Sequence, residues 1–429
     1  MSQFVIKTIP TSLARPRIRT LSRCLQCRNN SSQSSPLTDL IRSSIKATGS
    51  IPLSRYIQFC LSHPVHGYYS KGDIFGRKGD FVTSPEISQV FGELVGIWFM
   101  TRWLAAGQPS VRLLELGPGR GTLMDDILRT LYTFPGMASA IRQVHLVENS
   151  VKMQQLQADK LGQALHARGI SLSWSDKIDD VPMSELFTFV VAHEFFDAIP
   201  INLFEKTNEG FREVLVDLNP KYETLSSSTP STSFPKVVTS TKSPFHMTLS
   251  REPTPLSTVL PATSPRFASI PSGGRAEIAG ESWRIMRRLG EIISSGGGAG
   301  LIIDYGGEKY YGASFRAFQK HKLVDVFENP GEADLTANVD FEYLKESLDG
   351  LDVKSLGTIS QSDFLLKLGL QPRLEKLLQN AETPERKETI RKSAQRLIDP
   401  LGMGSQYRIL GLVDGSQSDS EIYPFPSLQ

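Results

Sequence analysis

The sequence predicts an α/β fold in which helices cover both faces of a Rossmann-like parallel sheet. The first observation is that strand-like and helix-like segments alternate over residues 111–192 and again over residues 283–304, which is the rhythm of repeated βαβ units. The second is that an apolar segment at 111–116 runs into a glycine-rich turn that opens a helical pattern. A length of 429 residues with 39% hydrophobic residues supplies enough apolar surface for a substantial core.

The first 38 residues differ in composition from the rest of the chain. They hold basic residues but no acidic ones, are rich in Ser and Thr, and begin with a cluster of apolar residues. This composition is typical of a mitochondrial presequence, and a disordered basic tail is the alternative. We therefore leave residues 1–38 out of the predicted folded part.

Charge and composition exclude several classes of protein. Without its leader the chain is slightly acidic, so electrostatics gives no reason to expect nucleic acid as a partner. No apolar run approaches the roughly 18 residues that a membrane span needs. Three cysteines cannot form a disulfide framework in a chain of this size, which favours a reducing compartment. Cys24 and Cys27 have metal-ligand spacing without a second pair nearby, so no metal site is predicted.

Residues 39–106 form a predicted helical region that precedes the sheet. Apolar residues recur at three- and four-residue steps, which is the period of a helix. Glycines and prolines interrupt this pattern over residues 64–86 and indicate a long loop, and long ordered loops are often functional. We take Asp80, Pro85 and Glu86 as candidate substrate residues, and the position of the loop before the core suits a lid.

The predicted core comes in two parts around an insertion. In the first part, residues 107–218, strands are expected at 111–116, 143–148, 171–174 and 186–192, helices at 122–131 and 151–166, and an edge strand at 211–217. The insertion, residues 219–274, is expected to be largely disordered because 15 of the 21 residues in 224–244 are Ser, Thr or Pro.

The second part of the core, residues 275–415, resumes the α/β pattern. Its expected elements are a helix over 283–293, a strand over 300–304, a helical tail after residue 340 and a possible edge strand over 407–413. Residues 416–429 are interpreted as a tail.

The strongest single signal is the glycine-rich turn after the first core strand. Gly117, Gly119 and Gly121 stand at alternate positions, so the backbone can pass close beneath a ligand and present its amide groups to it. In a dinucleotide fingerprint the third glycine would stand where Thr122 stands. Spacing of this kind after an acid is instead the S-adenosylmethionine pattern, in which Glu115 can reach the methionine ammonium group.

A second acid marks the end of the next strand. Glu148 lies where a carboxylate can hold both ribose hydroxyls of an adenosyl cofactor. Asn149 is either a further contact near the adenosine or the N-cap of the following helix.

Polar residues at the ends of two later strands are candidates for the chemistry. Glu194 and Asp197 follow a buried strand, and paired acids can orient a guanidinium group and offset its charge. The alternatives are solvated loop acids or a helix cap, and His193 is equally well explained as a packed, hydrogen-bonded residue. Asp304 and Tyr305 follow another strand and are expected to face the same cleft.

Five blocks taken together resemble the MidA family, over a region that extends from about Leu37 to Val413. The blocks are residues 79–88, 115–122, 194–200, 303–306 and 329–336. The resemblance implies a class I methyltransferase fold, S-adenosylmethionine as methyl donor and a place in the mitochondrial matrix. It also implies symmetric dimethylation of an arginine in a core subunit of respiratory complex I, in its iron–sulfur arm.

The family's cofactor residues correspond to Glu115, Gly117, Gly119, Gly121 and Glu148, with Glu194 and Asp197 as candidates for handling the substrate. An assembly chaperone that binds S-adenosylmethionine without turnover is the main alternative. A nucleotide-dependent oxidoreductase or a methyltransferase of small molecules would also have a Rossmann-like core.

Overall fold

The computed structural model describes residues 35–70, 83–222, 243–417 and 422–426. The presequence prediction therefore lies almost wholly outside the described residues, and so do Asp80 and most of the Ser/Thr/Pro-rich stretch. The predicted leader ends too late, because the first helix, α1, already begins at Pro36 and buries Leu37. Ser35 caps this helix by accepting a hydrogen bond from the Thr38 amide.

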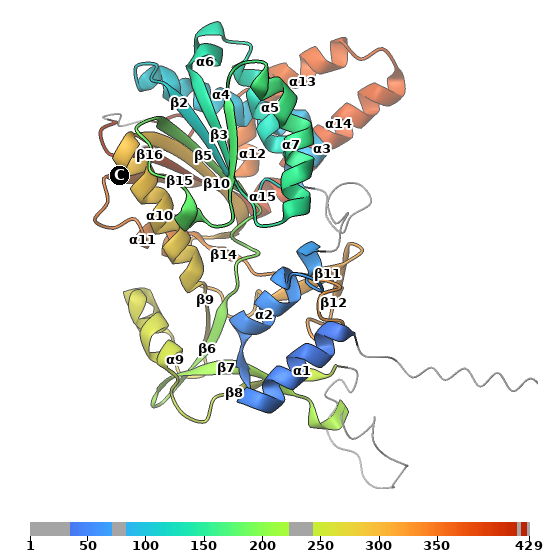
Figure 1. Cartoon of the computed structure of the whole chain (residues 1–429), viewed down its shortest axis with the longest axis vertical. Helices are drawn as coiled ribbons and strands as arrows, with labels where there is room; N and C mark the ends of the chain where they lie inside the picture. The colour runs from blue at the N-terminus through green and yellow to red at the C-terminus, as the bar shows by residue number, and fades with distance from the viewer. Residues whose placement is uncertain (1–34, 71–82, 223–242, 418–421, 427–429) are drawn as a thin grey trace, which may run out of the picture. The chain divides into compact units, whose positions relative to one another are not determined.

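An eight-stranded sheet forms the core of the fold, as the sequence predicts (Figure 1). In spatial order its main strands are β15 (Val353–Ser360), β16 (Tyr407–Asp414), β10 (Gly298–Gly307), β5 (Phe187–His193), β2 (Val111–Leu116), β3 (Ile141–Val147) and β4 (Ser171–Ser175). The strands from β10 to β4 are parallel, and β14 (Val339–Asp340) pairs with the end of β10. β16 is antiparallel to both of its neighbours. The edge-strand prediction for residues 407–413 is therefore wrong, because β16 lies inside the sheet.

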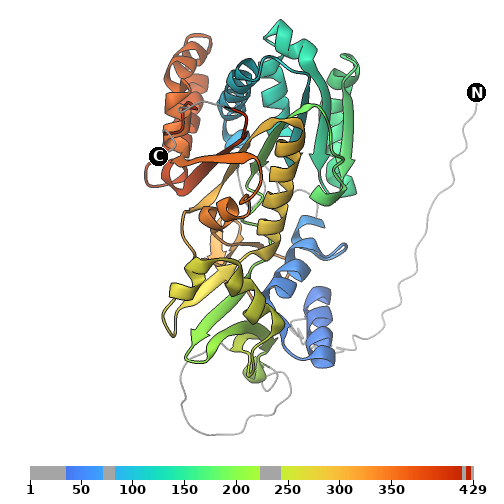
Figure 2. The ribbon, with the colours of Figure 1, turned by 90° about the vertical axis from the view of Figure 1, so that its left-hand side faces the viewer.

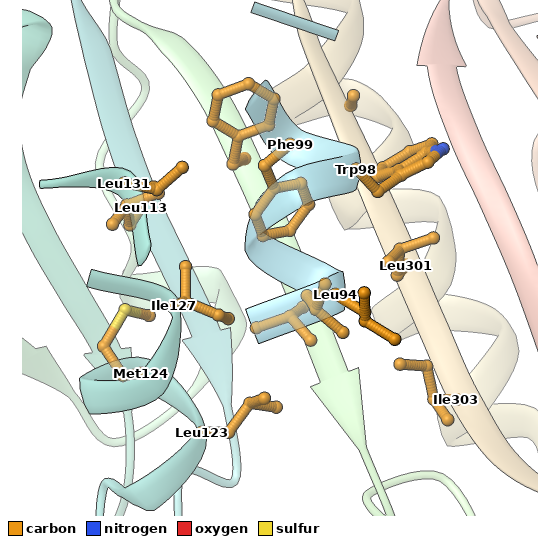
Figure 3. Close-up of a cluster of buried hydrophobic side chains, with 14 of the residues drawn as sticks. Leu94, Trp98, Phe99, Leu113, Leu123, Met124, Ile127, Leu131, Leu301 and Ile303 are labelled. Carbon is orange, nitrogen blue, oxygen red and sulfur yellow. The ribbon is translucent and has the colours of Figure 1, made fainter. Parts of the chain in front are cut away.

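Helices cover both faces of this sheet, which explains why its central strands are apolar on both sides. On one face, α4 (Gln89–Ala105) and α5 (Thr122–Leu131) pack Trp98, Phe99 and Ile127 against β2 and β10 (Figure 3). On the other face, α10 (Gly280–Gly296) contributes Met286 and Leu289 to a second buried cluster. Alternate residues of β2 divide between the clusters, since Leu113 belongs to the first and Leu114 to the second.

A second sheet corrects the predicted extent of the core. Its path runs β1 (Ile51–Pro52), β7 (Gly210–Leu218), β6 (Asn202–Thr207) and β9 (Arg275–Ile278), and β8 (Phe245–Leu249) also pairs with β7. Strand β7 was expected at the edge of the main sheet, but it lies inside this separate sheet. Helices α1 (Pro36–Thr48) and α2 (Leu53–Ser62) pack on one of its faces, and residues around Phe267 pack on the other (Figure 2).

The described part of the predicted insertion is ordered. Residues 243–274 include β8, the helix α9 (Pro255–Val259) and two short 3-10 helices. The prediction of a largely disordered insertion is therefore wrong for these residues, because Phe245, Phe267 and Ile270 are buried in the packing of the second sheet. Within the described ranges, no helix combines the length and the apolar character needed to cross a membrane.

A third, three-stranded sheet was not predicted. It consists of β12 (Lys322–Val324), β11 (Arg316–Gln319) and β13 (Asp334–Thr336), in that spatial order. Ala317 and Leu335 join the buried cluster beneath α1 and α2.

Candidate active site

The site lies where the order of the parallel strands reverses. From β2 the chain continues outward to β3 and β4, whereas β5 and β10 lie on the other side of β2. At such a switch point the loops after two neighbouring strands separate and leave a crevice at their carboxyl ends. The glycine turn follows β2, and Glu194 follows β5 directly.

The glycine turn has a backbone conformation that only glycine adopts readily. Gly117, Gly119 and Gly121 all have positive φ angles, of 62°, 49° and 75°. A Cβ atom on Gly117 would also lie 2.9 Å from Cδ2 of Phe195. Helix α5 begins at Thr122 immediately after the turn, so its unpaired backbone amides face the crevice.

Glu115 is a buried acid beneath this turn. Its side chain is only 3% exposed, and burial raises its pKa to about 8. Its Oε2 atom has no hydrogen-bond partner among the described residues. A buried carboxylate oxygen of this kind is costly unless a donor or cation meets it. The ammonium group of an amino-acid ligand fits this requirement.

Glu148 is held by neighbours that also hold the glycine turn. Its Oε1 accepts a 2.8 Å hydrogen bond from the Ser150 amide, while Gln157 reaches its Oε2 at 3.4 Å. The same Gln157 amide group donates to the Gly119 carbonyl at 2.7 Å, and Trp174 in turn fixes Gln157. Burial raises the pKa of Glu148, and these hydrogen bonds oppose the rise.

The structure excludes one of the two interpretations of the residue after Glu148. The N-cap of α7 (Val151–His166) is Ser150, whose hydroxyl accepts from the Met153 amide. Asn149 is therefore not the cap, and it lines the cavity described below. Gln157 was missed in the sequence because it lies on the buried face of α7, between Met153 and Leu161, and no motif surrounds it.

The turn that carries Glu194 and Asp197 is built on Asp304. Oδ2 of Asp304 accepts hydrogen bonds from three consecutive backbone amides, those of residues 195, 196 and 197, at 3.2, 2.9 and 3.2 Å. Its Oδ1 accepts from the Tyr305 amide at 2.8 Å. Asp304 is wholly buried, so it does not face the cleft as expected but holds the turn from beneath.

Glu194 is fixed by an unusual backbone and by a tyrosine from a distant strand. Its φ angle of 50° is rare for a residue with a side chain. The Tyr407 hydroxyl donates to its Oε1 at 2.5 Å, and the Tyr305 hydroxyl lies 2.6 Å from that of Tyr407. Burial raises the pKa of Glu194 to about 8, and the nearby Asp197 adds to the rise while Tyr407 opposes it.

Asp197 and His193 complete the polar set around Glu194. The Thr336 hydroxyl donates to Asp197 at 2.7 Å, and burial raises the pKa of Asp197 while Thr336 and Arg316 oppose the rise. Burial lowers the pKa of His193 to about 3, so its ring is neutral at physiological pH. Thr336 lies in the block at residues 329–336, but no pattern in the sequence indicated that Thr336 or Arg316 would be partners of Asp197.

The end of the predicted loop contacts the glycine turn. The Thr122 hydroxyl donates to Glu86 at 2.8 Å. Pro85 and Glu86 line the same cavity as the turn, and the Ser84 amide lowers the pKa of Glu194 by hydrogen bonding. This segment thus connects the glycine turn to the acids after β5.

One cavity of about 1480 Å³ joins these groups. The predicted residues that line it are Pro85, Glu86, Glu115, Gly117, Gly119, Thr122, Glu148, Asn149, His193, Glu194, Asp197 and Tyr305. It is large enough for a cofactor and a second reactant together, since pockets for a single drug-sized ligand have volumes of about 300–1,000 Å³. The sequence thus predicted much of the lining of one continuous space.

Glu115 can hold a cationic ammonium group, the glycine turn offers backbone amides, and Glu148 offers a carboxylate. Together these groups suit an adenosyl ligand that carries methionine. With a doubly wound sheet, this is the arrangement of a class I S-adenosylmethionine-dependent methyltransferase. A family profile described as S-adenosyl-L-methionine-dependent methyltransferase matches residues 94–359. The chain belongs to that family, and the predicted resemblance, fold and cofactor are confirmed.

Similar proteins are found along nearly the whole chain. Protein arginine methyltransferase NDUFAF7, mitochondrial, of Rattus norvegicus is 35% identical over 419 residues, covering 91% of this chain and 88% of the rat protein. The Homo sapiens protein of the same name is 36% identical, with coverages of 90% and 85%. A crystal structure from Burkholderia thailandensis, bound to S-adenosyl-homocysteine, has the same fold, with a TM-score of 0.70, 24% identity and coverages of 88% and 92%.

Proposed function

We propose that this chain methylates an arginine side chain of a client protein, with Glu194 and Asp197 as the residues that handle the guanidinium group. The observation that carries the proposal is the pair of largely buried acids on one turn that Asp304 holds by hydrogen bonds, in the cavity that also contains the glycine turn. The mitochondrial relatives named as protein arginine methyltransferases support it.

Cofactor binding is assigned to residues on the first two strands. In this proposal Glu115 holds the methionine ammonium group, Gly117 and Gly119 admit the backbone close to the ligand, and Glu148 takes the ribose hydroxyls. Gly121 is not among the residues that line the cavity; it shapes the turn through its φ angle of 75° and faces Leu161 and Gln157 of α7. Thr122 and Asn149 line the same cavity, and the proposal assigns them to cofactor binding as well. S-adenosylmethionine, when bound, supplies a methyl group on a positively charged sulfur, which a nitrogen lone pair can accept.

The acids have two tasks with a guanidinium substrate. They orient it, because a planar guanidinium group matches carboxylates with directed hydrogen bonds. They also accept its proton, because a group with a pKa above about 12 does not lose a proton to water before the nitrogen–carbon bond forms. A carboxyl group with a pKa of about 8, such as Glu194, is better matched to that proton than an ordinary glutamate.

Tyr407 and Asp304 act through these acids and are positioning residues. Tyr407 sets the orientation of the Glu194 carboxylate, and Asp304 fixes the backbone of the turn. Accurate alignment of the nucleophile supplies much of the acceleration in a displacement of this kind. Pro85, Glu86, His193 and Tyr305 form the walls around the acids in this proposal.

We also propose a specific product and place of action. The product is symmetric ω-N-dimethylarginine in a core subunit of the iron–sulfur arm of respiratory complex I, formed in the mitochondrial matrix. The MidA resemblance implies these details, and the mitochondrial names of the relatives agree with the location.

The test is methylation of a mitochondrial extract, depleted of the endogenous enzyme, with deuterated-methyl S-adenosylmethionine. Peptide mass spectrometry then locates the label and distinguishes symmetric from asymmetric dimethylarginine by its neutral losses. We expect labelled arginine with the native protein and at least about a hundredfold less with Glu194→Gln. The exposed Glu185→Gln serves as a control that keeps full activity. Binding of the cofactor with no labelled arginine would contradict the proposal and favour the assembly chaperone.

A further inference from the structure

One face of the three-stranded sheet belongs to the core, and its other face belongs to the cavity. In the register of this sheet Ala317 pairs with Leu335 and with Val324, and all three pack in the cluster beneath α1 and α2. Because side chains alternate along a strand, their neighbours point the opposite way. Those neighbours line the cavity, namely Arg316, Phe318, Leu323, Asp334 and Thr336.

The cavity face changes in character along β11. At its start Arg316 pairs with Thr336, whose hydroxyl bonds to Asp197. Two residues further on, Phe318 pairs with Leu323 across the hairpin. Leu323 is 68% exposed although it lines a cavity. The sheet thus leads from the acids of the active site to an apolar pair about 7 Å further along the strand.

A substrate arginine would place its own chain beside this apolar pair. Its guanidinium group occupies the space at Glu194 and Asp197, so the residues next to it in sequence lie further out in the same cavity. Asp334, the nearest acid on the sheet face, already accepts a hydrogen bond from Tyr69 at 3.2 Å. Arg316, the cation of this face, already donates to the Ser314 carbonyl and to the Asn338 side chain. A charged neighbour of the arginine would therefore lose hydration against Phe318 and Leu323, while Asp334 and Arg316 already have partners within the protein.

We propose that the cavity face of the three-stranded sheet binds the client chain beside the methylated arginine and selects an apolar residue at that position. This inference rests on the proposed function, because it takes the arginine to be bound at Glu194 and Asp197. Phe318 and Leu323 are the specificity-determining residues. The occupant is an extended client segment with a large aliphatic side chain next to its arginine.

The experiment measures binding of fluorescein-labelled nine-residue peptides to the full chain saturated with S-adenosylhomocysteine. One peptide has Leu on both sides of a central Arg, the other has Ser there, and all other residues are Gly or Ser. Fluorescence anisotropy should give a dissociation constant about tenfold lower for the Leu peptide. Phe318→Ala and Leu323→Gln should each remove most of this preference and leave binding of the Ser peptide within about twofold.

Leu104 provides a matched control, because it is also an exposed leucine. Leu104 is 52% exposed at the end of α4 and does not line the cavity, so Leu104→Gln should change neither dissociation constant. Thermal melting of each variant shows that it is folded.

Three outcomes would overturn the inference: equal affinity for the two peptides, no binding of either, or equal weakening of both by Leu323→Gln. A change in oligomeric state on Leu323→Gln would also overturn it, since the occupant would then be a second copy of the chain. Methyl transfer to the peptides separates the two proposals. Preferential binding of the Leu peptide without transfer refutes arginine methylation, whereas equal transfer to both peptides refutes only the role of the sheet.

Discussion

Replacing Glu115 by Gln should weaken the cofactor site and yet stabilise the ligand-free protein. The carboxyl group is buried, its Oε2 has no partner within the described part of the chain, and its pKa is about 8 against an ordinary value of 4.5. In the folded protein it therefore remains protonated at pH 7, whereas in the unfolded chain it is ionised. The unfolded state binds fewer protons, so this group lowers stability as pH rises from about 4.5 to 8.

The size of both effects follows from that pKa. At pH 7 the penalty on folding is about 3 kcal/mol, with an upper limit near 5 kcal/mol above pH 8. Gln keeps the shape of the side chain and has no charge to bury, so Glu115→Gln should raise the melting temperature of the ligand-free protein by a few degrees. Loss of a buried charge pair costs about 2 kcal/mol or more, so the variant should bind S-adenosylhomocysteine at least about thirtyfold more weakly at pH 8.

Calorimetric titration with S-adenosylhomocysteine between pH 6 and 8, together with thermal melting, checks both effects. Affinity of the native protein should rise about tenfold per pH unit over this range, because only the ionised Glu115 attracts the ammonium group. The variant should lose that dependence, and Glu185→Gln, which removes an exposed acid, should resemble the native protein in every respect. If Glu115→Gln bound the ligand with native affinity, or melted at a lower temperature without ligand, the assignment of Glu115 would be refuted.

Three further predictions concern the two turns of the site. Gly117→Ala should destabilise the protein by about 1–2 kcal/mol in urea unfolding and abolish S-adenosylhomocysteine binding, because of the positive φ and the 2.9 Å approach to Phe195; native stability would contradict this. The methyl-transfer rate should fall about tenfold per pH unit below pH 8, because the Glu194 pKa is about 8. Tyr407→Phe removes the hydrogen bond that lowers this pKa, so it should move the pH profile of transfer to higher pH. An unshifted profile would count against the pairing of Tyr407 with Glu194. Asp304→Asn replaces an accepting oxygen by a donor and should lower the free energy of unfolding in urea by about 2–3 kcal/mol. Methyl transfer should be reduced and cofactor affinity unchanged. Loss of cofactor affinity alone would show that Asp304 has a different role.

Local sequence predicted the elements that carry the cofactor site. The helices expected at 122–131 and 151–166 are α5 and α7 with the same bounds, since both have a clear helical period and begin after a glycine turn or a serine cap. The glycine motif was recognisable because the residues that form the cofactor turn lie next to one another in the sequence. In these segments the local sequence pattern and the tertiary structure favour the same conformation.

The other side of the cavity could not be predicted in the same way. Tyr407 bonds to Glu194 across 213 residues, and the two come together through the pairing of β5 with β10 and of β10 with β16. The strands β11, β12 and β13 have only three or four residues each, too few to show a reliable alternation. Strand β7 showed the alternation well, but an alternating pattern does not specify which sheet a strand joins.

The acids that sequence analysis singled out share a physical state that only the structure shows. Burial raises the pKa values of Glu115, Glu148, Glu194 and Asp197, so the ligand-free protein keeps these carboxyl groups in surroundings that disfavour their charge. Each lies in the cavity where a cation or a hydrogen-bond donor of the proposed reactants would enter. The burial that lowers stability therefore also raises the affinity for those groups, because a poorly hydrated carboxylate loses little water when it gains a partner. For Glu115, whose Oε2 has no hydrogen-bond partner among the described residues, nothing offsets this burial in the ligand-free protein, which is why replacing Glu115 by an amide should stabilise the protein while impairing cofactor binding.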